Sequence, residues 1–191
     1  MERFCVVISL VIDTATNRTS VALFEDNQLL FSGFHDGATA HAEALPKLVK
    51  EALHTRNDVD EVVVGMGPGP FTGLRVGITF AQTFAHARKI PWRGACSLDG
   101  IDVDSQSYIV ASDARRKEVY WAKYEAGKRV AGPHVSAPHK VAALDEMKFG
   151  FGFTEPLYPS MAMLLAKSRT APIEEPLYLR RPDAVPTSER R

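Results

Sequence analysis

The feature that most constrains the fold is a nearly continuous apolar run at residues 6–12 that ends in a polar turn. Its β-branched and aliphatic residues are typical of a central strand that is covered on both faces. Two more strand patterns, at residues 19–25 and 28–35, follow after tight turns and complete a three-stranded antiparallel meander. The chain is therefore expected to be an α/β protein whose sheet includes this buried first strand.

Helical periodicity follows the meander. Leu45, Leu48, Val49 and Ala52 recur at helical spacing, and an apolar strand covers residues 62–64. A long helix is expected at residues 74–88, before one more strand at residues 95–98. This order is the unit of the ribonuclease-H-like fold. The actin-like ATPases (the ASKHA proteins, such as actin, sugar kinases and Hsp70) are built from two copies of this unit.

A second copy of the unit begins near residue 107 and then degenerates. Strand patterns at residues 107–112 and 117–125 flank a turn, as in the first copy, but only short helical stretches at 141–147 and 161–167 follow. The sequence predicts two domains: a complete ribonuclease-H-like lobe at residues 1–100, and an abbreviated second lobe with a loose polar tail at residues 101–191.

Composition argues against several classes of function. Lys plus Arg equals Asp plus Glu at 23 each, so no net charge draws the chain to nucleic acid or membrane, and a partner would supply most of the charge for RNA. Cys5 and Cys96 lie far apart, which suggests neither a disulfide framework nor a zinc site. No apolar stretch reaches the roughly 20 residues of a membrane helix, so a cytoplasmic protein is expected.

The turn after the first strand has the residue types of a phosphate site. In this fold its backbone N–H groups and hydroxyls face the cleft between the lobes, and a carboxylate positions a metal ion. Asp13, Thr14 and Thr16 fit these roles, and Asp113 is the second-lobe counterpart across the cleft. Such a turn can equally be rich in Asp and Thr because their side chains bond to nearby backbone. ATP or ADP with Mg²⁺ is thus expected only at a shared or vestigial site.

The most distinctive segment is a glycine-proline loop that leads from a strand into the long helix. An anion could bind at the helix N-terminus, but no Gly-Lys-Ser/Thr follows, so the loop is not a P-loop. The alternative is that the loop shapes a turn that seats an aromatic residue and opens the helix. Its residues are Gly67, Pro68, Gly69, Phe71, Thr72, Gly73 and Arg75.

The long helix is apolar on two nearly opposite faces, with Arg75, Thr79, Gln82 and His86 in a narrow polar stripe. A sheet covers only one face, so the other needs another helix or another protein; burial within this chain is the alternative. The predicted partner interface comprises Leu45, Leu48, Val49, Val76, Phe80, Thr83, Phe84 and Ala87. No residue pattern suggests a catalytic nucleophile, an acid/base pair or a metal site.

Four segments together resemble the bacterial TsaB family, also called YeaZ, a paralogue of TsaD. They are Val11-Ile12-Asp13-Thr14-Ala15-Thr16, the loop from Gly67 through Gly77, Ser112-Asp113-Ala114-Arg115 and Pro176-Leu177-Tyr178-Leu179-Arg180. They span nearly the whole chain in the right order, and the glycine-proline loop is specific to TsaB and TsaD. The short connection after Asp99 and the reduced second lobe depart from the family's pattern.

The resemblance implies a non-catalytic scaffold that binds TsaD through the first two helices of the first lobe. With TsaE and TsaC, the pair makes N6-threonylcarbamoyladenosine at position 37 of tRNAs that read ANN codons. TsaD-like chains hold their metal with a His-x-x-x-His pair, whereas here His41 is followed at the second position by Leu45. Two alternatives stay open: a small ASKHA-type kinase or ATPase with Asp13 and Asp113 on Mg²⁺, and a chain that forms homodimers when alone.

Overall fold

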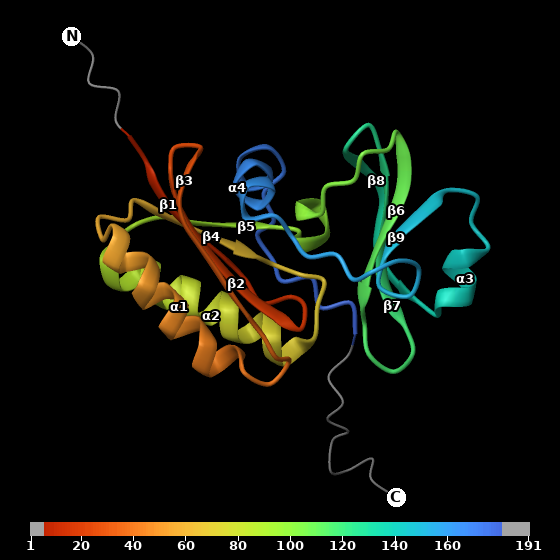
Figure 1. Cartoon of the computed structure of the whole chain (residues 1–191), viewed down its shortest axis with the longest axis horizontal. Helices are drawn as coiled ribbons and strands as arrows, with labels where there is room; N and C mark the ends of the chain where they lie inside the picture. The colour runs from red at the N-terminus through yellow and green to blue at the C-terminus, as the bar shows by residue number, and fades with distance from the viewer. Residues whose placement is uncertain (1–5, 181–191) are drawn as a thin grey trace, which may run out of the picture.

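The computed structural model describes residues 6–180 and contains two mixed sheets (Figure 1). The first has the order β3-β2-β1-β4-β5, with β1 (Ile8–Asp13), β2 (Arg18–Glu25), β3 (Gln28–Asp36), β4 (Glu61–Gly65) and β5 (Trp92–Ala95). The second has the order β8-β7-β6-β9, with β6 (Ser107–Asp113), β7 (Val119–Glu125), β8 (Lys128–Ser136) and β9 (Met147–Gly150).

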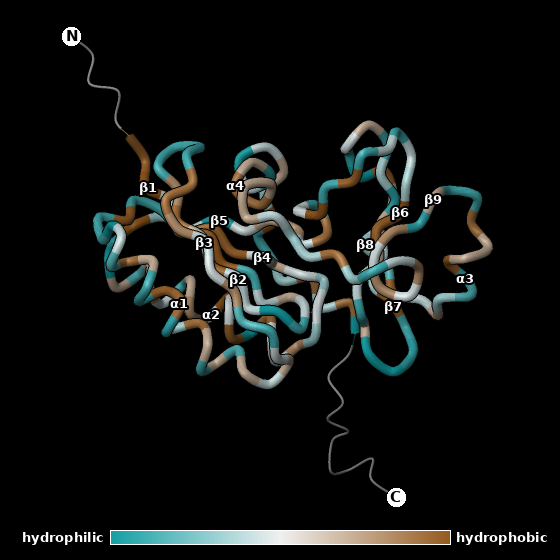
Figure 2. Tube along the Cα trace, in the orientation of Figure 1, coloured by the Kyte–Doolittle hydropathy of each residue, from teal (hydrophilic) through white to brown (hydrophobic). Residues whose placement is uncertain are grey.

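The first strand lies in the middle of its sheet, as its apolar sequence predicts. β1 pairs antiparallel with β2 and parallel with β4, and all six of its residues are buried. The helices α1 (His41–Thr55) and α2 (Phe71–Arg88) cover one face of this sheet (Figure 1). Figure 2 shows the hydrophobic residues concentrated on these strands, whereas the turn between β6 and β7 is hydrophilic.

The other face of the first sheet is covered by the last helix of the described chain, α4 (Met161–Thr170). Leu164 and Leu165 pack there with Val11 and Val63 in one buried cluster. The helix therefore returns from the second half of the sequence to complete the first lobe. The domain boundary near residue 100 stays a prediction, and the structure adds that residues 161–170 pack on the first sheet.

The second half repeats the order of the first, which confirms the ribonuclease-H-like, actin-like arrangement of one complete and one abbreviated lobe. Three antiparallel strands are followed by a short helix, α3 (Pro138–Ala142), by the parallel strand β9, and by α4. Within residues 6–180 the second sheet has no counterpart of β5.

Several predicted boundaries are wrong. The helix predicted at 141–147 is shorter and earlier, because Pro138 takes a first-turn position, where its missing N–H costs nothing. Met147 instead begins a strand. The strand predicted at 95–98 is β5, and a short 3₁₀ helix (Ser97–Gly100) follows it. The third strand of the second sheet, β8, was not predicted.

The two lobes are joined by a buried polar contact. Asp99, in the 3₁₀ helix, accepts a hydrogen bond from the Tyr124 hydroxyl at 2.8 Å and pairs with the Arg129 guanidinium, whose Nη2 lies 3.3 Å from Oδ2. Tyr124 and Arg129 belong to β7 and β8. Among the described residues, no helix combines the length and the apolarity needed to cross a membrane.

Candidate functional site

A groove of about 600 Å³ lies between α1 and α2 on the side away from the sheet. We call it the interhelical groove. Its lining is apolar or carries hydroxyl groups, and its one charged member is Arg75. The lining residues are Ala42, Leu45, Pro46, Phe71, Thr72, Arg75, Val76, Thr79, Phe80 and Thr83.

Two glycines place α2 so that its second apolar side stays open. A Cβ on Gly73 would lie 2.7 Å from the Thr14 carbonyl oxygen, and one on Gly77 would lie 2.3 Å from Thr14 Oγ1. The helix therefore packs closely against the turn after β1, and it begins at Phe71, ahead of the predicted start at residue 74. These glycines serve close approach of the backbone.

The side of α2 that faces the groove carries half-buried aromatic residues. Phe80 and Phe84 stack with their ring centroids 6.0 Å apart, and the Arg88 guanidinium lies 4.7 Å from the Phe84 ring centroid. Val76 is half-buried and Thr83 and Ala87 are exposed. These five predicted interface residues on α2 thus form part of the protein surface.

The three predicted interface residues on α1 lie deeper. Leu45, Leu48 and Val49 are buried and belong to the core cluster against the sheet, although Leu45 also reaches the floor of the groove. The exposed α1 contribution comes from Ala42 and Pro46 instead, which the sequence analysis did not single out. Their signal was present, since an i, i+4 pair lies on one helix face.

Pro46 lies inside α1 at its sixth residue. Proline has no backbone N–H, so the Ala42 carbonyl lacks its usual partner four residues later. Both residues line the groove. The groove thus has Ala42 and Pro46 of α1 on one side and the Arg75 cation of α2 on the other.

The predicted phosphate turn is closed. Asp13 is 1% exposed, and its carboxylate accepts hydrogen bonds from Ser97 Oγ at 2.6 Å and from the Ala15 N–H at 3.0 Å. Burial raises the pKa of Asp13 to about 6, although both hydrogen bonds act in the opposite direction. Thr14 is also buried and donates to the Gly73 carbonyl at 2.8 Å. These two side chains serve the packing of the first lobe.

The structure places Thr16 and Asp113 in the lining of one cavity, and Asp13 is not part of that lining. Thr16 and Asp113 line a cavity of about 30 Å³ between the lobes, which is close to the volume of one water molecule. Asp113 accepts a hydrogen bond from the Arg115 N–H and forms an ion pair with the Arg115 side chain. Ligand pockets are typically about ten times larger or more.

The glycine-proline loop is fixed by contacts with both lobes. Gly67 and Ser97 share a backbone hydrogen bond of 2.7 Å, and the Tyr120 hydroxyl from β7 donates to the Gly69 carbonyl at 3.3 Å. A Cβ on Gly69 would lie 2.4 Å from the Ala15 carbonyl oxygen. Pro68 is buried with them, while Phe71 packs on Tyr178 at 5.0 Å between ring centroids. These contacts hold the loop between the turn after β1 and the strand β7; whether it also binds an anion stays a prediction.

His41 is buried, with Nδ1 2.8 Å from Thr19 Oγ1, and burial lowers its pKa. The second position of the His-x-x-x-His pattern, Leu45, is fully buried in the core. Residues 6–180 contain no cluster of three His, Cys, Asp or Glu side chains that is suited to a metal ion.

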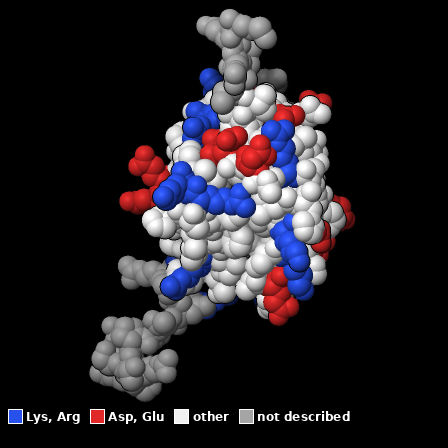
Figure 3. Space-filling model, turned by 90° about the vertical axis from the view of Figure 1, so that its left-hand side faces the viewer, with Lys and Arg blue, Asp and Glu red and all other residues white. Residues whose placement is uncertain are grey.

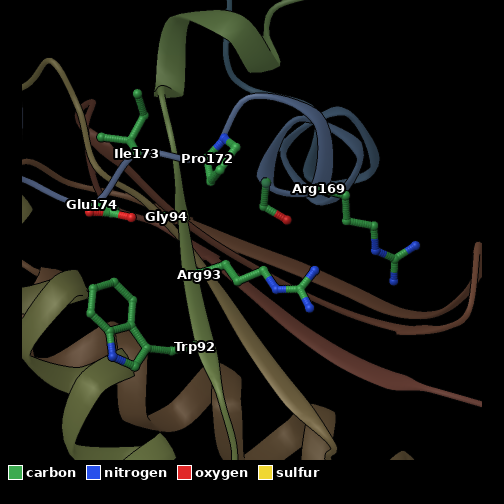
Figure 4. Close-up of a pocket in the computed structure, with 8 residues that line it drawn as sticks. Trp92, Arg93, Gly94, Arg169, Pro172, Ile173 and Glu174 are labelled. Atoms are coloured by element: carbon green, nitrogen blue, oxygen red, sulfur yellow. The ribbon is translucent and has the colours of Figure 1, made fainter.

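A further cavity of about 450 Å³ lies at the β5 edge of the first sheet (Figure 4). Arg93 and Arg169 extend toward the same side of the strand. Arg169 lies 3.2 Å and Arg93 3.7 Å from the buried carboxylate of Glu61, which also accepts from Ser9 Oγ at 2.7 Å. Because Glu61 lies in β4, its ion pair with Arg169 ties α4 to the sheet, whereas its ion pair with Arg93 joins β4 to β5.

Figure 3 shows one end of the molecule, where Lys and Arg side chains lie beside Asp and Glu side chains. On this face the charges of opposite sign are mixed, and no single basic surface appears. Independently of this view, Arg56 forms ion pairs with both Glu25 and Asp58. The distribution on this face agrees with a formal net charge of zero for the whole chain.

Comparisons with known proteins place these features in a family context. A family model described as "TsaD: tRNA N6-adenosine threonylcarbamoyltransferase" matches residues 35–174. An uncharacterized protein of Mycobacterium tuberculosis is 42% identical over 97% of this chain and 98% of its own length. The tRNA threonylcarbamoyladenosine biosynthesis protein TsaB of Escherichia coli is 34% identical, over 61% of this chain and 54% of that protein. The structure of YeaZ from Pseudomonas aeruginosa is similar with a TM-score of 0.74 and 28% identity, covering 91% of this chain and all of that one.

Proposed function

Because the chain belongs to the TsaB (YeaZ) family, whose named relatives are tRNA threonylcarbamoyladenosine biosynthesis proteins, we propose that it is the non-catalytic subunit of a tRNA threonylcarbamoyl-transferase complex. It binds a TsaD-like paralogue and thereby supports formation of N6-threonylcarbamoyladenosine at position 37 of tRNAs that read ANN codons. The observation that carries this proposal is the open interhelical groove.

The groove supports a protein partner in preference to a small ligand. It lies between two helices and is lined by the half-buried Val76 and Phe80, and the half-buried Phe84 follows one turn further along α2. Contiguous apolar surface of this kind is typical of protein interfaces. Covering the rings of Phe80 and Phe84 would remove further apolar area from water, at about 25 cal/mol per Å².

The family match indicates which partner fits. The TsaD model matches residues 35–174, a range that contains both α1 and α2. A TsaD-like protein should therefore carry counterparts of both helices. Two related surfaces of the same shape can pair around an approximate two-fold axis, as identical surfaces do in isologous dimers. The proposed interface is a mixed bundle of four helices, two from each protein.

The closed phosphate turn supports assigning the transfer chemistry to the partner. Asp13 is turned onto Ser97 and the interlobe cavity is small. A nucleotide used by the assembly would then bind at a site that the partner shares or supplies. A TsaE-like ATPase and a TsaC-like enzyme act in the same pathway, and tRNA reaches the chain through the complex.

Thr83→Arg tests the docking surface. Thr83 is exposed and lines the groove, so a charged arginine should leave the fold intact and prevent close packing of a partner helix. Gln82→Arg is the matched control, because residue 82 is also exposed but does not line the groove. In co-purification with the TsaD-like protein of the same organism, only Thr83→Arg should lose the partner. Phe80→Asp, if folded, should behave as Thr83→Arg does. Equal recovery of Thr83→Arg and Gln82→Arg would contradict the proposal.

Reconstitution tests the function. Threonylcarbamoylation of an ANN-decoding tRNA transcript by TsaC, TsaD and TsaE is measured with and without the chain, beside ATP hydrolysis by the chain alone. Activity that depends on the chain, without hydrolysis by the chain alone, is the expected result. Unchanged tRNA modification together with hydrolysis that is lost in Asp113→Asn would favour a small ASKHA-type kinase or ATPase.

A further inference from the structure

Arg75 differs from every other residue that lines the interhelical groove. It is exposed and it is the one charged member of the lining. Among the described residues it forms no ion pair, although the arginines at 18, 56, 93, 115, 129, 169 and 180 each pair with a carboxylate. The acidic residues of α1, Glu43 and Glu51, do not line the groove.

A partner that covers the groove would remove water from around Arg75. A guanidinium that loses water without gaining a carboxylate is costly, whereas a well-aligned carboxylate can accept two parallel hydrogen bonds from it. The position of Arg75 beside the apolar lining also affects the register of the partner helix. Apolar contacts alone allow several positions of that helix along the groove. One charged contact would fix this register.

We propose that Arg75 is the residue that selects the partner: the cognate TsaD-like protein places a carboxylate against it, and a second copy of this chain does not. This inference rests on the proposed function and specifies the chemistry of the same surface. In a two-fold pair of identical grooves, two copies of Arg75 would be buried and no acidic lining residue would face them. Unpaired like charges disfavour the wrong pairing, which is how many interfaces achieve specificity.

Arg75→Met tests this role. Methionine keeps a long flexible side chain and removes the charge. Lys47→Met is the control, since Lys47 is exposed on α1 and does not line the groove. We expect the Kd for the TsaD-like partner, measured by calorimetry, to rise about tenfold or more for Arg75→Met, which corresponds to the loss of one charged contact. The control should bind as the wild type does.

Two further readouts separate a charge contact from simple packing. Raising the salt concentration should weaken binding by the wild type more than binding by Arg75→Met. In sedimentation of the chain alone, Arg75→Met should self-associate at least as strongly as the wild type. Wild-type affinity of Arg75→Met for the partner, or weaker self-association of this variant, would overturn the inference. If Thr83→Arg still loses the partner, the docking surface stands and only the role of Arg75 fails; if Thr83→Arg binds normally, the proposed function itself fails.

Discussion

At the scale of single residues, Asp13 is a buried carboxylate in the turn that was predicted as a phosphate site. A Cβ at position 65 would lie 1.9 Å from Asp13 Oδ2, so Gly65 is what allows the carboxylate to pack against the neighbouring strand. Ser97, which donates to that carboxylate, is 84 positions away in the sequence. The carboxylate has hydrogen-bond donors but no cation, and it is buried.

Asp13→Asn should stabilise the protein at neutral pH. The folded pKa of Asp13 is raised from 3.8 to about 6, so the folded state retains the proton and ionisation is penalised. Ionisation of the buried Asp13 carboxyl therefore lowers the free energy of unfolding. This destabilisation is absent below pH 4, grows as the pH rises to about 6, and stays constant above that pH at about 3 kcal/mol. Asparagine can accept from the Ala15 N–H and donate to Ser97 Oγ. Urea unfolding at pH 4 and pH 8 should show the gain only at pH 8; an equal gain at both values would refute the assignment.

The residues of this turn were identified from the sequence, but their roles were not. Asp13, Thr14 and Thr16 have the composition both of a phosphate site and of an ordinary turn. What decides between these is tertiary: Thr14 meets Gly73 and Gly77 of α2, and Asp13 meets Ser97. No local pattern encodes such pairings.

At the scale of elements, α4 is the helix whose position the sequence hid. Its ten residues predicted a short helical stretch in the reduced lobe, yet it completes the first lobe. Ser160 caps its N-terminus, and Arg169 at its C-terminal end pairs with Glu61 of β4. A single short amphipathic pattern says that a helix exists and which side is apolar; it does not say which of two sheets receives that side.

Leu164→Ala should destabilise the whole protein, because Leu164 is fully buried against the first sheet. Loss of a buried leucine side chain costs roughly 2 to 5 kcal/mol, including the cavity left behind. Ala166→Ser, at an exposed position of the same helix, is the control and should change stability by less than about 0.5 kcal/mol. Thermal unfolding of both variants provides the comparison. A Leu164→Ala variant as stable as Ala166→Ser would contradict the observed packing.

The long helix shows what periodicity did predict. Its two apolar sides are present, and the sheet buries the side with Leu74, Ile78 and Ala81. The second apolar side of α2 is exposed or half-buried, as an interface requires. The residues of α1 that were predicted to belong to the interface, Leu45, Leu48 and Val49, instead pack in the core against the sheet. An amphipathic helix next to a sheet points its strongest apolar stripe inward, which leaves smaller residues such as Ala42 for the outer surface.

At the scale of the whole molecule, the two lobes are held by a few specific contacts. Asp99 is the centre of one of them, with the Tyr124 hydroxyl and the Arg129 guanidinium both directed at its carboxylate. Tyr108 stacks on Tyr124 beside them, with ring centroids 5.2 Å apart. Burial, followed by the nearby Asp99 charge, raises the pKa of the Tyr124 hydroxyl, which therefore stays a donor.

Asp99→Ala should loosen the junction between the lobes. It removes the acceptor of the buried Tyr124 hydroxyl and leaves the partly buried Arg129 without its carboxylate, at a cost of roughly 3 kcal/mol. Hydrogen exchange should increase first in β7 and β8, where these donors lie. Asp102→Ala, at an exposed position three residues later, serves as control. Unchanged exchange in β7 and β8 of a destabilised variant would show that Asp99 acts within the first lobe alone.

The return of α4 to the first sheet also sets an order of events during synthesis. A nascent chain that has emerged only as far as Gly100 contains all five strands of the first sheet and the helices of one face, but nothing for the other. Val11, Phe24 and Val63 then remain exposed until residues 161–170 have left the ribosome. Domains commonly fold in turn from the N-terminus as they are made. In this chain one face of the first sheet lacks its cover until α4 has been made, so we expect the two halves to complete their folding together.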